Sequence, residues 1–245
     1  MWLFNSSIGR KLVMSVTGIA LVLFITFHGC MNVVALISGK AYNTICALLG
    51  SNWYAIAATL GLAALMVIHI IYAFILTAQN RKARGNNKYA VTDKPEKVEW
   101  ASQNMLVLGI IVVLGMILHL KDFWYNMMFA ELFPSLAPII KDAAGNTIEP
   151  TDGFSYMKQT FGNPVFSGLY IIWLVAIWFH LTHGVWSAMQ TLGLSGHIWF
   201  KRWKCIGQIW STVIMALFLL VVLAFWFCPD CVGQCDFKLL PFAVN

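Results

Sequence analysis

Charged residues are scarce in this sequence. Only 11% of its 245 residues are Asp, Glu, Lys or Arg, whereas 60% are hydrophobic. Soluble globular domains carry about 25% charged residues, so this composition excludes a chain that folds as a soluble domain. A glycine-rich dinucleotide fingerprint is also absent, and no segment between the apolar runs has room for a dinucleotide-binding domain.

Five long apolar runs predict an all-α membrane protein. Each run exceeds the roughly 20 residues that a helix needs to cross ~30 Å of hydrocarbon. The chain 1–245 is therefore expected to form a single membrane domain of five transmembrane helices. The polar start at 1–11 leads straight into a full span, so no cleavable signal peptide is expected. Segment 130–163 is predicted to be a loop with a short surface helix. The runs cover approximately 12–37, 53–78, 102–129, 164–190 and 207–228.

Lysine and arginine predict the orientation, because cytoplasmic loops are enriched in them. If the N-terminus is inside, 11 of the 16 basic residues lie on the inner side. We therefore expect a cytoplasmic N-terminus and a periplasmic C-terminus. The net charge of +6 then requires no nucleic acid, and the basic loop 79–97 could meet lipid headgroups or a partner protein. The inner residues are Arg10, Lys11, Arg81, Lys82, Arg84, Lys88, Lys94, Lys97, Lys201, Arg202 and Lys204. The outer ones are Lys40, Lys121, Lys141, Lys158 and Lys238.

Four histidines lie inside four different apolar runs, where a polar side chain is costly and usually has a partner. At the outer level, His28 pairs in depth with His119. At the inner level, His69 pairs with His180 or His183. Each pair joins two helices at a common depth, as a haem iron with two axial imidazoles requires. The pattern predicts a helical bundle that encloses two b-type haems.

Small residues accompany these histidines. Gly29, Gly115 and Gly184 either let a flat macrocycle approach the backbone or bring helices together, as small residues do in membranes. Ser15 and Thr17 could hydrogen-bond to a porphyrin edge or to carbonyls of their own helix.

Two segments carry a family resemblance. SSIGRKLVMSVTG followed by ITFHGCMN, within 6–32, and FHLTHGVWSAMQTLG, residues 179–193, resemble spans one and four of a cytochrome b. The chain is similar to the membrane-anchor subunit of bacterial succinate dehydrogenases and fumarate reductases, in particular the two-haem, five-helix b558 type that uses menaquinone. The likeness extends over the whole chain in helix count, helix order and histidine placement.

The resemblance assigns the haem ligands. It implies that His28 and His119 bind the iron of the outer haem. It implies that His69 and His180 bind the iron of the inner haem. His183 is then the second candidate after His180, and it is expected near the inner haem or a quinone.

The resemblance also implies the activity. Such anchors hold a flavoprotein subunit with FAD and an iron–sulfur subunit at the cytoplasmic face of the bacterial inner membrane. Electrons pass between the iron–sulfur subunit and menaquinone or menaquinol, and the direction stays open between the tricarboxylic acid cycle and anaerobic respiration. The chain would be the quinone-reactive subunit, and the succinate and fumarate site, with its catalytic residues, would lie on a partner. The docking surface is expected at 2–11, 79–100 and 191–206.

Two departures from the family leave the quinone site open. Some fumarate reductases of this type have a glutamate where Trp178 stands, and the outer loop 38–52 lacks a carboxylate that some relatives place there. Asp122 and Glu131 are outer carboxylates that could exchange protons instead, although both fit plain solvated loop acids. His197 is expected at the surface of a short inner loop.

Cysteines near the C-terminus form the motif CPDCVGQC. Covalent haem attachment requires C-x-x-C-H, and Val232 takes the place of that histidine. A periplasmic location favours a disulfide among Cys228, Cys231 and Cys235, with the pairing open.

Two alternative functions are compatible with parts of the pattern. The nearer is the cytochrome b anchor of a formate dehydrogenase or hydrogenase, which shares the haems and has another partner. The farther is a transporter whose histidines relay protons, which is disfavoured because no acidic residue lies in the middle of any span.

Overall fold

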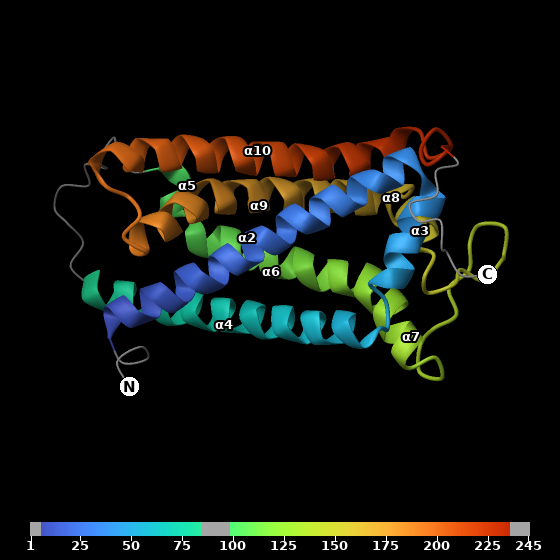
Figure 1. Cartoon of the computed structure of the whole chain (residues 1–245), viewed down its shortest axis with the longest axis horizontal. Coiled ribbons are helices and arrows are strands. Elements are labelled where there is room, and N and C mark those ends of the chain that lie inside the picture. Colours follow the sequence, from blue (N-terminus) through green and yellow to red (C-terminus); the bar gives the residue numbers. More distant parts are fainter. Residues whose placement is uncertain (1–5, 85–98, 236–245) are drawn as a thin grey trace.

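The computed structural model describes residues 6–84 and 99–235. The chain is about 80% helical, and the described residues form no strand beyond two isolated β-bridges. Five helical segments are long and apolar enough to cross a membrane. The predicted all-α bundle with five candidate spans is therefore confirmed (Figure 1). The helices are α2 (Ser7–Ile37), α4 (Trp53–Arg84), α6 (Met105–His119), α9 (Pro164–Thr191) and α10 (His197–Phe227).

The third span is a composite of three helical segments. The π-helix η1 (Leu120–Phe129) continues α6 directly, and α7 (Ala130–Leu132) follows it. A π-helix has wider turns than an α-helix, and such segments occur often at functional sites. Here the change of helix type falls immediately after His119.

Side-chain caps explain where two of the helices begin. The Ser6 hydroxyl accepts a hydrogen bond from the Gly9 N–H at 2.9 Å, so α2 starts five residues before the predicted 12. The Asn163 side chain accepts from the Val165 N–H at 2.9 Å, and Pro164 occupies the first turn of α9. Proline suits that position because its missing N–H has no helical acceptor there.

The start of α10 corrects one sequence expectation. His197 is the first residue of α10 and not a loop residue, because the helix continues ten residues toward the N-terminus from the predicted limit of 207. That first part carries basic side chains, which lowered the apolar signal in the sequence.

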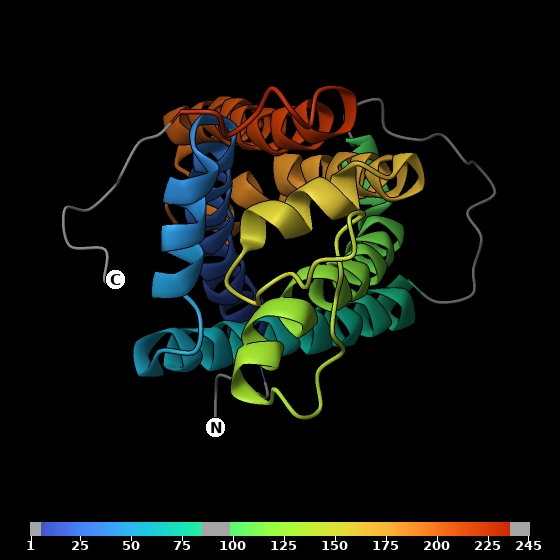
Figure 2. The same ribbon diagram turned by 90° about the vertical axis from the view of Figure 1, so that its right-hand side faces the viewer.

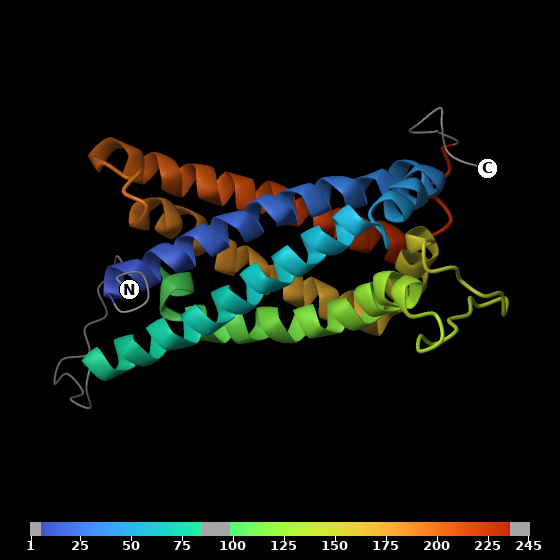
Figure 3. The same cartoon turned by 60° about the horizontal axis from the view of Figure 1, so that its bottom comes forward.

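The long helices pack around α2 and α9. α2 crosses the bundle and contacts α4, α9 and α10, whereas α9 also contacts α6 and α10. Figure 3 shows α2 and α4 lying side by side. No residue in the most apolar 18-residue stretch of α4 is buried. α4 therefore lies at the edge of the bundle and joins it chiefly through α2.

Short elements cover the end of the bundle where α2 and α10 finish, which we call the cap end (Figure 2). α3 (Gly39–Leu48) follows α2 after a turn at Ser38, and α8 (Gly153–Phe161) packs against α3, η1 and α10. α8 is the short helix expected within 130–163, but it buries Tyr156, Met157 and Phe161 and so belongs to the packed core. α3 was not predicted from the sequence.

The segment after α10 is tied back to the end of α2. Gly233 donates its N–H to the Leu36 carbonyl at 3.1 Å, and its own carbonyl accepts from Gly39 at 3.2 Å. A disulfide joins Cys228 to Cys231 and leaves Cys235 as a free, exposed thiol. The structure thus gives the pairing that the sequence left open.

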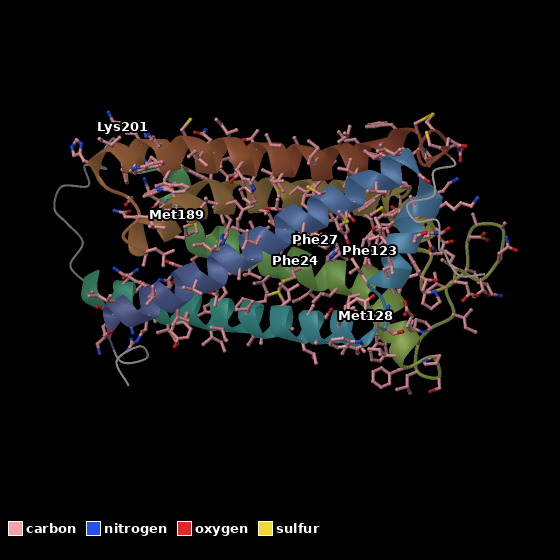
Figure 4. All side chains as sticks on the ribbon, viewed as in Figure 1. Phe24, Phe27, Phe123, Met128, Met189 and Lys201 are labelled. Carbon is pink, nitrogen blue, oxygen red and sulfur yellow. A yellow bond between two sulfur atoms is a disulfide. The ribbon has the colours of Figure 1, made fainter. Side chains whose placement is uncertain are left out.

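The opposite end, where α2 and α10 begin, is the basic end. It also holds α5 (Trp100–Gln103), and Figure 4 labels Lys201 there. Lys88, Lys94, Lys97 and Lys238 lie outside the described residues. Of the described basic residues, eight lie toward this end and four toward the cap end. The eight are Arg10, Lys11, Arg81, Lys82, Arg84, Lys201, Arg202 and Lys204; the four are Lys40, Lys121, Lys141 and Lys158.

Candidate functional site

The first histidine pair lies in the half of the bundle nearer the cap end. His28 on α2 and His119 at the end of α6 have ring centroids 5.8 Å apart, with their planes at 79°. Phe24, one turn before His28, stacks on its ring at 5.4 Å, and Phe123 lies 5.2 Å from the ring of His119 (Figure 4). Two helices that are far apart in sequence thus present their imidazoles to each other.

The second pair lies in the half nearer the basic end. His69 on α4 and His180 on α9 have ring centroids 6.4 Å apart, with their planes at 64°. Of the two partners that depth allowed for His69, the structure brings His180 to it. Thr17, on α2 beside this pair, lies 11 residues before His28, so the two levels differ by roughly 16 Å along that helix at ~1.5 Å per residue.

Thr17 holds His69 in one orientation. Its hydroxyl bonds to the carbonyls of Val13 and Met14 at 2.9 and 3.0 Å, and its oxygen lies 3.1 Å from His69 Nδ1. Because the hydroxyl proton is used on α2, the oxygen accepts a hydrogen bond from Nδ1–H. His69 Nε2 then carries the free electron pair. Histidines that bind metals commonly donate their second ring N–H in this way.

His28 is held by a polar chain from the cap end. The Asn32 amide nitrogen lies 3.4 Å from His28 Nε2, a long contact, and the Asn32 carbonyl oxygen accepts from the Tyr42 hydroxyl at 3.0 Å. Because the Asn32 amide group donates to it, His28 Nε2 carries no proton. An iron bound at that nitrogen would replace the long contact with Asn32.

The geometry of both pairs fits a six-coordinate haem iron. An imidazole nitrogen binds a first-row metal ion at about 2 Å, so two imidazoles on opposite sides of one ion have ring centroids roughly 6 Å apart. The observed separations are 5.8 and 6.4 Å. Each pair also contains one buried ring nitrogen that has no hydrogen-bond partner among the described residues. This nitrogen is Nδ1 of His119 in the first pair and Nδ1 of His180 in the second.

Among the described residues, each level holds two facing imidazoles. Within 6–84 and 99–235, no group of three or more His, Cys, Asp or Glu side chains converges on a point. A metal ion held by these imidazoles would need its other ligands from a cofactor. The four pyrrole nitrogens of a porphyrin meet this need, so the residues present fit haem.

His183 points to a different set of groups. Its Nδ1 lies 3.4 Å from a Glu99 oxygen, and its ring packs on Trp186 at 4.9 Å. The other Glu99 oxygen accepts from Lys204 at 2.6 Å. Burial alone would raise the pKa of the Glu99 carboxyl group, but the hydrogen bonds from Lys204 and His183 hold it below its ordinary value of 4.5. His183 therefore joins α9 to α10 through Glu99.

The glycines divide between packing and open space. A Cβ on Gly29 would meet the Phe218 ring at 3.1 Å, and a Cβ on Gly115 would collide with the Trp173 ring. These two glycines serve helix packing, contrary to a role beside a macrocycle. Gly184 has no atom within 4 Å of such a Cβ, so its surroundings leave the macrocycle interpretation open.

The two candidate carboxylates at the cap end have different surroundings. Glu131 accepts from the Ser51 N–H at 2.8 Å and so ties α7 to the connection between α3 and α4. Asp122 is buried on η1, with 8% of its surface exposed, and accepts from the Tyr170 hydroxyl at 3.3 Å. Asp122 is thus no solvated loop acid, because the π-helix turns it inward.

A cavity of about 260 Å³ lies beside Asp122 at the cap end. Asn126 and Tyr156 line it, and exposed Gln159 and Asn163 stand at its rim. Burial, with a smaller contribution from the charge of Asp152, raises the pKa of Tyr156 to about 12. Tyr156 therefore presents a neutral hydroxyl.

Trp178 forms a hydrogen bond to a neighbouring helix. Its indole N–H donates to the Thr212 hydroxyl on α10 at 3.0 Å. His197 lines a separate cavity of about 400 Å³ at the basic end, together with Lys201 and Phe200. Neither residue approaches a histidine pair in the contacts of the described residues.

Comparison of the chain with protein-family models, with curated proteins and with solved structures finds no match. The fold and the two histidine pairs therefore rest on the sequence and the geometry given above.

Thr17 and Asn32 are the positions that sequence reasoning undervalued. The sequence suggests a porphyrin edge or its own helix as partners for Thr17, and it indicates no role for Asn32. A signal did exist, since each is a polar residue inside an apolar run on the helix of His28.

Proposed function

We propose that this chain is the membrane-anchor, di-haem cytochrome b subunit of a succinate dehydrogenase or fumarate reductase complex. The observation that carries the proposal is the arrangement of His28 with His119 and of His69 with His180. Two imidazole pairs, at two levels of one membrane-spanning bundle, have the separation that axial ligation requires. The bound haems would supply one-electron transfer.

The chain's own residues would orient these ligands. Thr17 fixes the tautomer of His69 so that its Nε2 is free for the iron. A ligand held in one rotamer loses less entropy on binding, and such supporting contacts typically change metal affinity by about 10- to 100-fold.

The charge distribution supports the orientation and the docking face. Basic residues concentrate at the end where α2 and α10 begin, as expected for a cytoplasmic face. We propose that the flavoprotein and iron–sulfur subunits bind there. The described parts of this surface are 6–11, 79–84, 99–100 and 191–206; residues 2–5 and 85–98 lie outside the described residues.

Menaquinone or menaquinol would exchange electrons with the haems. The chain would then be the quinone-reactive subunit, located in the bacterial cytoplasmic membrane. The family resemblance of 6–32 and 179–193 supports this part of the proposal.

A reduced-minus-oxidised absorption spectrum with a haem count tests the proposal. We expect a b-type spectrum and two haems per chain. His28→Ala and His69→Ala should each leave one haem, whereas the matched variants His183→Ala and His197→Ala should keep both. No b-type band, or two haems after loss of His69, would overturn the assignment.

Co-purification identifies the complex. A flavoprotein that interconverts succinate and fumarate supports the proposal. A molybdenum- or nickel-containing partner would instead identify the anchor of a formate dehydrogenase or hydrogenase.

A further inference from the structure

The starting observation is a disulfide on the surface of the cap end. Cys228 and Cys231 follow α10 directly, are both exposed and have two residues between them. Structural disulfides of secreted proteins resist reduction, whereas exposed ones are reduced more easily and are often regulatory or catalytic. Reactive thiols also occur often in Cys-X-X-Cys motifs. Whether this disulfide is a structural cross-link depends on what else holds the turn.

Backbone hydrogen bonds hold the two cysteines close together. The Cys228 N–H donates to the Ala224 carbonyl at 3.0 Å and so continues the pattern of α10. The Cys231 N–H donates to the Cys228 carbonyl at 2.9 Å, which closes the same turn as the disulfide. The two Cα atoms are 5.3 Å apart, a usual separation for a disulfide. The backbone therefore keeps the cysteines at pairing distance whether the S–S bond is closed or open.

The residues after the turn are attached independently of the disulfide. The Val232 side chain is buried in the core. The Gly233 N–H donates to the Leu36 carbonyl at 3.1 Å, and the Cys235 N–H donates to the Ile37 carbonyl at 3.0 Å. These bonds fasten the segment to the end of α2, so opening the disulfide would leave it in place.

The turn is also anchored by the residue between the cysteines. The Asp230 carboxylate accepts from Lys158 on α8 at 2.6 Å, and the Asp230 carbonyl accepts from the Gln234 side chain at 2.7 Å. A disulfide stabilises a fold mainly by restricting the unfolded chain, and this effect is smallest when the closed loop is short. With only two intervening residues, this disulfide contributes little as a cross-link.

We propose that Cys228 and Cys231 form a thiol–disulfide exchange site, which reacts with the dithiol or disulfide group of another molecule at the cap end. In the proposed orientation this end faces the periplasm, where disulfides persist. The site goes beyond the proposed function, because it requires neither haem nor quinone. Cys235 stays outside the pair as a free, exposed thiol.

The exchange balances in electrons and protons. A thiolate of the incoming dithiol attacks one sulfur of the disulfide, the S–S bond breaks, and the other cysteine leaves as a thiolate. The second thiolate of the dithiol then attacks the mixed disulfide and releases the first cysteine. The dithiol loses two electrons and two protons and becomes a disulfide, while the cysteine pair gains them. The reverse sequence reoxidises the pair.

Equilibration of the purified complex with glutathione gives the direct test. The probe is a series of mixtures of reduced and oxidised glutathione, followed by maleimide labelling and mass spectrometry. We expect Cys228 and Cys231 to be labelled together as the proportion of reduced glutathione rises, and to become protected again when it falls. Structural disulfides remain oxidised in such mixtures. A wild-type pair that stays unlabelled throughout overturns the inference without needing any variant.

The dependence on total glutathione identifies a paired site. Reduction of the pair consumes two glutathione molecules and forms one oxidised glutathione. Raising total glutathione tenfold at a fixed ratio of the two forms should therefore raise the ratio of reduced to oxidised pair by about tenfold. The single thiol of Cys235 exchanges one glutathione for another, so its labelling should not change. A pair that is equally insensitive overturns the inference.

Serine variants provide matched controls. Cys235→Ser should leave the titration of the pair unchanged. Cys228→Ser leaves Cys231 without its partner, so the labelling of Cys231 should lose its dependence on total glutathione. If that dependence persists in Cys228→Ser, the pair is not the site.

Hydrogen exchange separates an exchange site from a structural cross-link. The Gly233 and Cys235 amides donate to carbonyls at the end of α2, and such bonded amides exchange slowly unless the segment opens. We expect both amides to stay protected when the pair is reduced in the wild-type complex. Loss of their protection on reduction would show that the disulfide holds the segment, and would overturn the inference.

The outcomes are independent of those for the proposed function. A complex with two haems whose cysteine pair stays oxidised overturns the inference alone. A complex without haem whose pair follows the glutathione mixtures overturns the proposed function and supports the inference.

Discussion

Gly115→Ala places a methyl group where α6 meets α9. The new Cβ would overlap the indole ring of Trp173, nearest to its Cδ1 and Cγ atoms. The ring cannot retreat freely, because its N–H donates to the Val112 carbonyl at 2.9 Å and its centroid lies 5.6 Å from that of the His119 ring. The two helices must separate, or Trp173 must give up this hydrogen bond.

The magnitude follows from these contacts. Overpacking costs about 1–3 kcal/mol, and loss of the indole hydrogen bond costs about 1 kcal/mol. Replacing a helical glycine by alanine returns about 0.5–1 kcal/mol. We therefore expect Gly115→Ala to lower the free energy of unfolding by about 1–3 kcal/mol.

Gly109→Ala is the matched control on the same helix. No atom lies within 4 Å of its added Cβ, so this variant should be neutral or slightly more stable than the wild type. Denaturant titration in mild detergent, followed by circular dichroism, measures both.

A double mutant shows whether Trp173 causes the effect. Trp173→Phe removes the pyrrole edge, so Gly115→Ala should cost less in that background than in the wild type. The interpretation would be wrong if Gly115→Ala were as stable as Gly109→Ala, or if the two changes were additive. If the effects of Gly115→Ala and Trp173→Phe are additive and the Gly115→Ala variant loses haem, Gly115 faces the macrocycle instead.

Three further predictions concern single positions. Thr17→Val should weaken retention of the haem proposed at the basic end by about 10- to 100-fold, measured by haem titration. Thr26→Val, which removes a hydrogen bond only to its own helix, should not weaken it. Glu99 has a lowered pKa, so its contribution to stability is complete above pH 4.5 and is lost as the pH falls through the lowered value. The difference in thermal midpoint between wild type and Glu99→Gln should therefore be present at pH 7 and vanish in acid; a difference independent of pH would refute this. Alkylation without reductant should label Cys235 and spare the 228–231 disulfide, and mass spectrometry that finds the opposite would refute the pairing.

Asp122 shows what a sequence position conceals. In the sequence it lies beside Lys121, close to the end of an apolar run, and resembles a solvated loop acid. In the structure the π-helix extends the span past it and sets it against Tyr170, a residue 48 positions further along the chain. Local composition cannot reveal a partner at that separation.

The helix α3 at the cap end could not be predicted from the sequence either. α3 has no amphipathic run long enough to stand out, and its start depends on the Ser38 hydroxyl, which accepts from Ala41 at 3.2 Å, and on the Gly233 carbonyl. A cap contributed by residues almost 200 positions away is not visible in a local window.

The sequence by itself determined the five spans, their order and the depth of each histidine, because hydrophobic length and charge bias act locally along the chain. It limited the partner of His69 to His180 or His183, which lie at nearly the same depth in one span, so depth could not distinguish them. Only the tertiary structure brought His180 to His69 and His183 to Glu99, because rotation of a helix about its axis is set by packing against its neighbours. The same packing decided that Thr17 orients a histidine and that Asp122 is buried.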